Sequence, residues 1–362
     1  MTIRRWGACL LTATLALGLA PALGAPGTAA SAASTCSAPQ TWQPGRSYAL
    51  GDVVVYPGNG RTYKVVNVIT GGTDATDPTI STWYWQPAAC AARPPASAKR
   101  SVGGYYPWWV ASPMRLTQVD SNYSLIYLFA ATAAPGDTSG AVGFELPSDV
   151  NGAATNWGAD LQTVRRQGRK VMLSVGGAGH AMAFPNRWVS QRFVDSIDRL
   201  YTSWGGFDGI DLNTFEGSQA PDTSEMIWIA RELKRRHPGF LVSAPPAPWS
   251  SVDLAFCQDM LAAGALDWCA PQYYDGPDLA DPAYVRTSVD RWMGALGPQH
   301  VAIGLGIDPS TPNYESVASA TAIWDDVEAR YPGVRGAFNW QIASDAAQGY
   351  PFAARLGPLV RD

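Results

Sequence analysis

Short apolar runs alternate with helical patterns from residue 101 to the end of the chain, and this alternation restricts the possible folds most. Strands that alternate with helices favour a parallel sheet, and eight such strands predict a (β/α)8 barrel of the TIM type within an α/β fold class. An open, doubly wound sheet is the alternative that the pattern alone allows. The expected strands lie at 102–107, 125–130, 170–175, 206–213, 240–244, 266–274, 301–306 and 336–340. The expected helices lie at 156–168, 188–203, 222–237, 252–264, 281–295 and 316–330.

The N-terminus has the pattern of a secretory signal peptide, which we place at residues 1–32. Arg4 and Arg5 precede an apolar run, and Ala30-Ser31-Ala32 offers a small-residue cleavage site. The apolar run, residues 10–19, is too short to span a bilayer. We therefore expect a secreted, extracellular protein without a membrane partner. A buried N-terminal helix is the other interpretation of this stretch.

Cysteines and composition divide the rest of the chain. We expect a small module at 33–90, a Pro- and Ala-rich linker at 91–100 and the barrel at 101–362. Removal of the signal would leave an even number of cysteines, which exported proteins usually pair. Four cysteines allow three connectivities, and we favour Cys36–Cys90 with Cys257–Cys269 because each pair lies within one expected domain.

The charge and histidine content exclude several functions. The net charge is −4 and no basic run follows the first few residues, so nucleic acid is not an expected partner. The three histidines are scattered and the cysteines lack zinc spacing, so we expect neither a metal site nor a cofactor. We expect the chain to act as a monomer.

Two motifs end the third and fourth expected strands. Ser174-Val175-Gly176-Gly177 ends an apolar run, and the segment 207–216 reads FDGIDLNTFE. Carboxylates in an apolar frame are costly to bury, so a chain keeps them for chemistry or pairs them. Side chains two residues apart on a strand share one face, which predicts that Asp211 and Asn213 point to the same side.

These motifs resemble the SxGG and DxxDxDxE signatures of the family 18 glycoside hydrolases, the chitinases and their relatives. The sequence departs from the signature at its end. Asn213 stands where the family has its third aspartate, and Phe215 stands where the family has its catalytic glutamate. Glu216 comes one residue late. The matching residues are Ser174, Gly176, Gly177, Asp208, Gly209 and Asp211.

The position of Glu216 depends on local backbone geometry. A regular strand would send Glu216 to the face opposite Asp211. A β-bulge around Thr214-Phe215 would rotate it back, and bulges are frequent beside active sites. We predict the bulge and a catalytic Glu216, because no other glutamate lies nearby on this strand. An exposed loop carboxylate is the alternative.

The resemblance implies further site residues at other strand ends. It implies that Tyr274 hydrogen-bonds the acetamido group of the substrate and that Trp340 forms the floor of the −1 sugar site. The predicted catalytic residues are Glu216, Asp211, Asn213 and Tyr274. The predicted substrate-binding residues are Tyr106, Phe129, Gly177, Gln272, Asp275, Trp340 and Asp208.

The resemblance also implies an activity, namely hydrolysis of β-1,4-linked N-acetylglucosamine polymers with retention and with assistance from the substrate. The short stretch 307–314, where larger members insert a domain, favours an open cleft and endo cleavage. Asn213 carries no charge, so a weak or inactive, lectin-like chitin-binding barrel is a second interpretation. An endo-β-N-acetylglucosaminidase acting on N-glycans is a third, which the attached module disfavours.

The segment 33–90 resembles the small all-β, chitin-binding modules attached to many bacterial chitinases. Its partners would be chitin and chitin oligosaccharides. Flat aromatic rings can stack on the apolar faces of pyranose sugars. We predict Tyr56, Trp83 and Trp85 on the binding surface, and Trp42 and Tyr48 in the core.

Overall fold

The computed structural model describes residues 40–56, 61–69, 77–88, 100–110, 113–213, 222–276, 278–279 and 281–360. Parallel strands from residue 101 onward form one sheet in the order β12-β11-β10-β9-β6-β5-β15-β14-β13. β12 and β13 lie end to end at one strand position, and a bridge between Cys269 and Val301 brings the two ends of the sheet together. The predicted (β/α)8 barrel is thereby confirmed.

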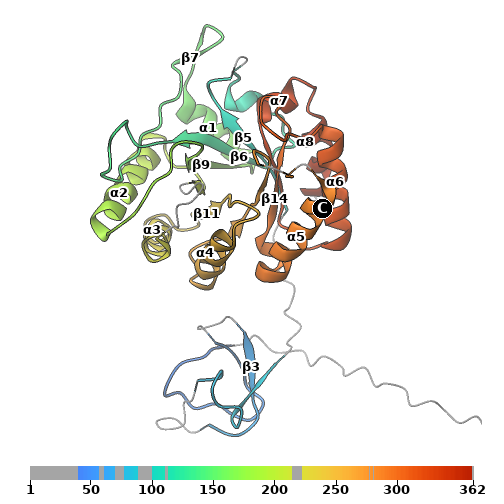
Figure 1. The fold of residues 1–362 in the computed structure, drawn as a ribbon. Helices are drawn as coiled ribbons and strands as arrows, with labels where there is room; N and C mark the ends of the chain where they lie inside the picture. Colours follow the sequence, from blue (N-terminus) through green and yellow to red (C-terminus); the bar gives the residue numbers. More distant parts are fainter. Residues whose placement is uncertain are drawn as a thin grey trace, which may run out of the picture.

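The barrel strands lie close to their predicted positions, and Figure 1 shows helices packed around them. The first strands are β5 (Ser101–Pro107), β6 (Leu125–Ala131), β9 (Lys170–Gly176) and β10 (Gly209–Asn213). The others are β11 (Leu241–Ala244), β12 (Trp268–Cys269), β13 (Gln272–Tyr273), β14 (Ala302–Gly306) and β15 (Gly336–Trp340). A short hairpin pairs β7 (Asp149–Val150) with β8 (Ala153–Ala154).

Among the described residues, six long helices cover the outside of the barrel, and each begins at a capping side chain. An Asn, Asp or Ser oxygen accepts a hydrogen bond from a backbone N–H of the first turn in each case. Loss of one such cap typically costs about 1 kcal/mol. The helices are α1 (Trp157–Arg166), α2 (Arg187–Ser203), α3 (Thr223–Arg236), α4 (Ser251–Ala262), α5 (Pro282–Leu296) and α6 (Val317–Arg330). The caps are Asn156, Asn186, Asp222, Ser250, Asp281 and Ser316.

Short helices complete the barrel, and a buried aspartate anchors the last of them. Asp345 accepts hydrogen bonds from the Tyr123 hydroxyl and from the backbone N–H groups of Phe352 and Ala353. This fixes the C-terminal helices against the first strands. The short helices are η1 (Leu116–Gln118), η2 (Pro298–His300), α7 (Ile342–Ala346), α8 (Pro351–Leu356) and η3 (Gly357–Val360).

The strands separate two apolar layers because successive side chains alternate between the two faces of the sheet. In β10, Ile210 and Leu212 belong to the large layer between sheet and helices. Asp211 and Asn213 therefore face the barrel interior, where a second cluster contains mostly aromatic side chains. The fold thus places polar side chains of β10 on the inside of the barrel.

Two expected strands differ from their predicted bounds by more than one residue at either end. The sixth, predicted as one run, is broken between β12 and β13, where Pro271 lacks the N–H that a ladder needs. The fourth begins at Gly209 rather than at residue 206, because Gly205 and Gly206 have φ values of 72° and 93° and form a turn. The fourth strand still ends at residue 213, and the sixth ends at Tyr273, one residue earlier than predicted.

Cys257 of α4 and Cys269 of β12 form a disulfide. The bond ties one outer helix to the sixth strand position. Cys36 and Cys90, the other expected pair, lie outside the described residues. Within the described ranges, none of the helices has the length and apolar composition needed to cross a membrane.

The N-terminal region contains a four-stranded sheet in the order β1-β2-β3-β4. β1 pairs parallel with β2, and the remaining pairs are antiparallel. Its bounds are β1 (Gln40–Thr41), β2 (Val53–Val55), β3 (Thr62–Val65) and β4 (Trp85–Pro87). Its core consists of Tyr48, Val54, Tyr63, Val65, Ile69 and Trp85.

Candidate active site

Asp211 is a buried carboxylate inside the barrel, held by hydroxyl groups from its two neighbouring strands and from β5 across the interior. Its Oδ2 atom accepts hydrogen bonds from the Tyr105 hydroxyl at 2.8 Å and the Ser174 hydroxyl at 2.9 Å. Its Oδ1 atom accepts from the Ser243 hydroxyl at 2.7 Å. These donors come from β5, β9 and β11 respectively, so Asp211 is fixed from three sides and is only 1% exposed.

The electrostatics around Asp211 are set by burial and by neutral donors. Burial raises the pKa of Asp211, and the hydroxyls of Ser243, Tyr105 and Ser174 oppose that rise. Burial and the nearby Asp211 carboxylate also raise the pKa of Tyr105 and of Tyr274 well above the usual tyrosine range. Both phenols therefore remain neutral hydrogen-bond donors at physiological pH.

Asn213 lies two residues after Asp211, on the same face and nearer the C-terminal end of β10. It is 8% exposed, and its backbone carbonyl accepts a hydrogen bond from the Gly177 N–H at 2.8 Å. Its side-chain amide makes no hydrogen bond to the part of the chain that the structure describes. An amide in this position can donate to a ligand or accept from one.

Glu216 lies outside the described residues, as do Thr214 and Phe215. The predicted bulge and the predicted orientation of this carboxyl group therefore stay predictions. What the structure fixes is the end of β10, because Asn213 pairs with Gly176 in the register of β9. The segment that carries Glu216 thus begins at the C-terminal mouth of the barrel.

Aromatic rings cover the interior beside Asp211. The Trp340 ring lies 4.9 Å from Phe129 and 5.6 Å from Tyr105, measured between ring centroids. Trp109, which is 53% exposed, lies 5.7 Å from Phe129 and extends this surface outward. A side chain at Gly177 would overlap the Phe129 ring, and the φ of +99° there also favours glycine.

Tyr274 follows β13 and belongs to the same inner cluster. A side chain at Gly306 would overlap Tyr274, so the glycine leaves room for the phenol. Asp275 is exposed, has a φ of 64°, and donates its backbone N–H to the Pro312 carbonyl at 3.0 Å. Its carboxylate also contributes to the raised pKa of Tyr274.

Gln272 holds the backbone of a neighbouring strand end. Its side-chain Nε2 donates to the Pro245 carbonyl at 2.9 Å, and its backbone N–H donates to the Pro246 carbonyl at 3.1 Å. The side-chain amide nitrogen thus supports the segment after β11, although the residue is only partly buried.

The structure corrects the prediction for Tyr106. Its side chain points outward, packs on Trp157 of α1 at 6.1 Å between ring centroids, and donates its hydroxyl to the Met114 carbonyl. Adjacent residues on a strand face opposite sides, so Tyr105 takes the interior position instead. The alternation of side chains along the strand could have identified Tyr105, but only with knowledge of which face of β5 points inward.

Asp208 is also placed differently from its prediction as a substrate-binding residue. It precedes β10 at the end opposite Asn213. Its carboxylate pairs with Arg165 at 3.1 Å and Lys170 at 3.2 Å, and it accepts the Val171 N–H at 3.0 Å. These contacts join strand and helix at the N-terminal side of the barrel, away from the mouth.

Besides Tyr105, two partners of Asp211 were not predicted as site residues. Ser174 was part of the SxGG motif, and Ser243 was not singled out. Both pair in register with Asp211, one on each neighbouring strand. The sequence does show a serine near the end of each strand that flanks β10. Only the register of the strands shows that both serines lie beside Asp211.

The aromatic residues of the N-terminal region divide between core and surface. Trp85 is 1% exposed and packs edge-on against Tyr48, so its prediction as a surface residue is wrong. Tyr56 is partly buried and donates its hydroxyl to Asp77. Trp83 is 70% exposed. Of the three rings predicted on the surface, Trp83 is the one that the structure leaves mostly open.

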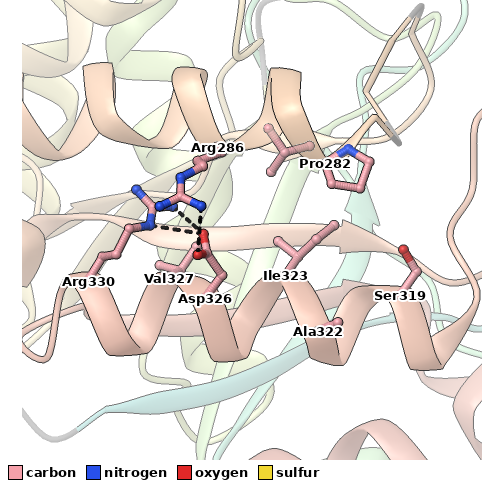
Figure 2. A pocket seen from close by; sticks show the side chains of 9 residues that line it. Pro282, Arg286, Ser319, Ala322, Ile323, Asp326, Val327 and Arg330 are labelled. Carbon is pink, nitrogen blue, oxygen red and sulfur yellow. Dashed lines mark hydrogen bonds and ion pairs between the residues drawn. The ribbon is translucent and has the colours of Figure 1, made fainter. Parts of the chain in front are cut away.

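A groove on the outer surface lies between α5 and α6. Arg286 and Arg330 both point toward Asp326, at 3.3 Å and 2.7 Å (Figure 2). The groove contains none of the residues around Asp211, so it is separate from the candidate site. Its lining consists of Pro282, Val285, Arg286, Ser319, Ala322, Ile323, Asp326, Val327 and Arg330.

Comparison with known proteins gives one family and distant relatives. The family described as "Glycosyl hydrolases family 18" matches residues 101–353. A chitinase of Paenibacillus xylanexedens is 28% identical over 149 residues, and chitinase 1 of Rhizopus niveus is 26% identical over 222 residues. These matches cover 37% and 56% of this chain, but 27% and 43% of those proteins, so the chain matches less than half of each.

A solved structure supports the same fold. The family 18 chitinase of Chromobacterium violaceum superposes with a TM-score of 0.62 at 24% identity. The match covers 90% of this chain and 100% of that one. At this identity the likeness shows the architecture of the barrel and nothing about the side chains around Asp211.

Proposed function

This chain belongs to family 18 of the glycosyl hydrolases, and on that premise we propose that it is a secreted chitinase that cleaves β-1,4-linked N-acetylglucosamine polymers internally. The observation that carries the proposal is Asp211, a buried carboxylate held by three hydroxyls just before the segment that bears Glu216. Asp345 is buried and hydrogen-bonded in a similar way but joins the C-terminal helices to the barrel, whereas Asp211 lies on the interior face of β10, two residues before the end of the strand at the barrel mouth.

The reaction that we propose is retaining and uses the substrate's own acetamido group. Glu216 donates a proton to the glycosidic oxygen, and the C1–O bond breaks with its electron pair going to that oxygen. The acetamido carbonyl oxygen bonds to C1 and forms an oxazolinium ion. Glu216 then removes a proton from water, which attacks C1, reopens the ring and restores the acetamido group. Proton transfer of this kind typically contributes about 10²–10⁴-fold in rate.

Asp211 would stabilise the positive charge of this intermediate from within the barrel. Its three hydroxyl partners favour the ionised form and fix its orientation. Tyr274 would donate from its neutral phenol to the acetamido oxygen. Asn213 would orient the acetamido N–H through its amide oxygen, without adding a second negative charge.

Aromatic surfaces support a sugar polymer as the substrate. Trp340 would form the floor beneath the sugar at the cleavage point, and Phe129 and Trp109 continue the aromatic surface outward. Pyranose rings present apolar C–H faces, which pack favourably on such rings. Trp83 would give the N-terminal region a separate contact with solid chitin.

The test is removal of the proposed acid with a matched control. Glu216→Gln should abolish the release of shortened chitin oligomers while binding to solid chitin persists. Glu145→Gln changes an exposed glutamate before β7 and should leave hydrolysis unchanged. Turnover that survives the change at Glu216 would contradict the assignment of the acid.

A second function is favoured by one observation, the neutral Asn213 in place of a carboxylate. With a less stabilised intermediate, the barrel would bind chitin and release no product, as a lectin does. Incubation of the unmodified protein with chitin oligomers separates the two, because the lectin retains them intact. Cleavage of N-glycans rather than of chitin oligomers would instead support an endo-β-N-acetylglucosaminidase.

A further inference from the structure

Trp249 is an exposed tryptophan at the barrel mouth that the proposed site does not use. It follows β11, and its side chain is 53% exposed. In the sheet order, three strand positions separate β11 from β5 in either direction, since β12 and β13 share one position. Trp249 and Trp109, which follows β5, therefore extend from diametrically opposite strands.

The backbone around Trp249 is fixed by hydrogen bonds. The Pro248 carbonyl accepts from the Trp292 Nε1–H at 3.0 Å and from the Ser288 hydroxyl at 3.3 Å. The Ala247 N–H donates to Asp253 at 2.9 Å. An exposed indole on such a support loses little conformational freedom when it binds a ligand.

One part of the Trp249 ring lies against the segment that follows Tyr274. A Cβ atom at Gly276 would lie 3.1 Å from Cζ3 and 3.2 Å from Cη2 of Trp249, closer than ordinary packing allows. Gly276 does not have a positive φ, so its backbone conformation does not demand glycine. The missing side chain instead leaves room for this edge of the indole and for Leu279, whose Cδ1 atom would lie 2.8 Å from such a Cβ, while 53% of Trp249 stays exposed.

We propose that Trp249 is a sugar-binding platform that holds an N-acetylglucosamine unit of the polymer on the side of the mouth opposite Trp109. This inference rests on the proposed function and deepens it. A chain that crosses the mouth would contact Trp109 on one side, Trp340 at the cleavage point and Trp249 on the other. Binding on both sides of the cleavage point selects the interior of a polymer over its ends.

The experiment compares Trp249→Ala, Trp249→Phe and Trp188→Ala with the unmodified protein on chitin oligosaccharides of increasing length. Trp188 is 62% exposed on α2 and serves as the matched control. Trp249→Ala should raise KM for the longest oligomers by about 10-fold, since ring stacking and buried area are lost together. KM for the shortest oligomer that is cleaved should stay unchanged. Trp249→Phe should raise KM by a smaller factor, and Trp188→Ala should leave KM unchanged.

The outcomes separate this inference from the proposed function. One outcome is that the unmodified protein cleaves the oligomers while Trp249→Ala has the same KM as the unmodified protein at every length. In that case the proposed role of Trp249 is wrong and the proposed chitinase activity is unaffected. An equal loss at every length would indicate a structural role and would also overturn the platform. If the unmodified protein neither binds nor cleaves any oligomer, both proposals fail.

Discussion

Tyr105 reaches across the barrel interior from β5 and donates its hydroxyl to the Asp211 carboxylate of β10 at 2.8 Å. The two residues are 106 positions apart in sequence. Tyr105 also contacts Trp340 and Phe129, so one side chain connects the polar centre to the aromatic floor. The geometry of Asp211 therefore depends on the first strand as well as on its own.

Replacement of Tyr105 by phenylalanine tests this connection. The hydrogen bond lowers the pKa of Asp211 against the effect of burial, so its loss should raise that pKa and disorient the carboxylate. We expect kcat to fall about 10- to 100-fold, since a hydrogen bond to a charged group contributes about 1.5–3 kcal/mol. Steady-state kinetics on chitin oligomers give the value.

Tyr106→Phe is the matched control for this variant. It removes an equivalent hydroxyl that bonds to Met114 on the outer side of the same strand. We expect lower stability and an unchanged kcat. Equal losses of kcat in the two variants would mean that the contact between Tyr105 and Asp211 has no special role.

Asn213→Asp should change the pH dependence of hydrolysis. The substitution introduces a second carboxyl group on the interior face, two residues from Asp211. A second negative charge near the proposed acid favours its protonated form, so the alkaline limb of the kcat profile should move to higher pH. Profiles of the two proteins that superimpose would show that residue 213 does not influence the acid.

Glu315 makes the stability of the fold depend on pH. It lies between β14 and α6, is 3% exposed, and neither carboxyl oxygen has a partner among the described residues. Burial raises its pKa from 4.5 to about 8. Between these values the unfolded chain has lost a proton that the folded chain keeps, so rising pH lowers the free energy of unfolding.

Glu315→Gln removes this titration and should stabilise the protein by a few kcal/mol near pH 8, with little change below pH 4.5. Urea unfolding across this pH range measures the difference. Glu328→Gln is the control, because Glu328 forms a partly exposed ion pair with Arg100, of a kind worth about 1 kcal/mol or less. Parallel stability curves for Glu315→Gln and the unmodified protein would contradict the placement of this carboxyl group.

Trp83→Ala tests the N-terminal region without touching the barrel. Loss of the exposed ring should release the protein from solid chitin, while hydrolysis of soluble oligomers stays the same. Trp85→Ala should instead destabilise the small sheet by about 3–5 kcal/mol, because Trp85 is part of its core. Pull-down assays and thermal unfolding separate the two effects. Unchanged retention after Trp83→Ala would remove this residue from the proposed binding surface.

The barrel strands could be predicted because each buried strand is a short apolar run with helical periodicity on either side. Pro271 divided the sixth strand, although a proline within a run is itself a known warning. For the candidate site, the residue at which each strand ends matters more than the residue at which it begins. Residues 213 and 340 end β10 and β15, and residue 274 directly follows β13, as the linear pattern indicated.

The failures at individual residues share one cause, which is that a motif does not state the direction of a side chain. Asp208 is part of the acidic motif, yet it lies before β10 and pairs with Arg165. Tyr105 and Tyr106 are identical in type, and only the register of β5 decides which one faces Asp211. Ser243 could not be found without the pairing of β10 with β11.

The stereochemistry of hydrolysis tests the central claim most directly. Proton NMR of chitin oligomers in the first minutes of reaction should show products in the β-anomeric form, and Glu216→Gln should yield none. Products in the α-anomeric form, or a Glu216→Gln protein that cleaves at the unmodified rate, would contradict a retaining mechanism that depends on Glu216.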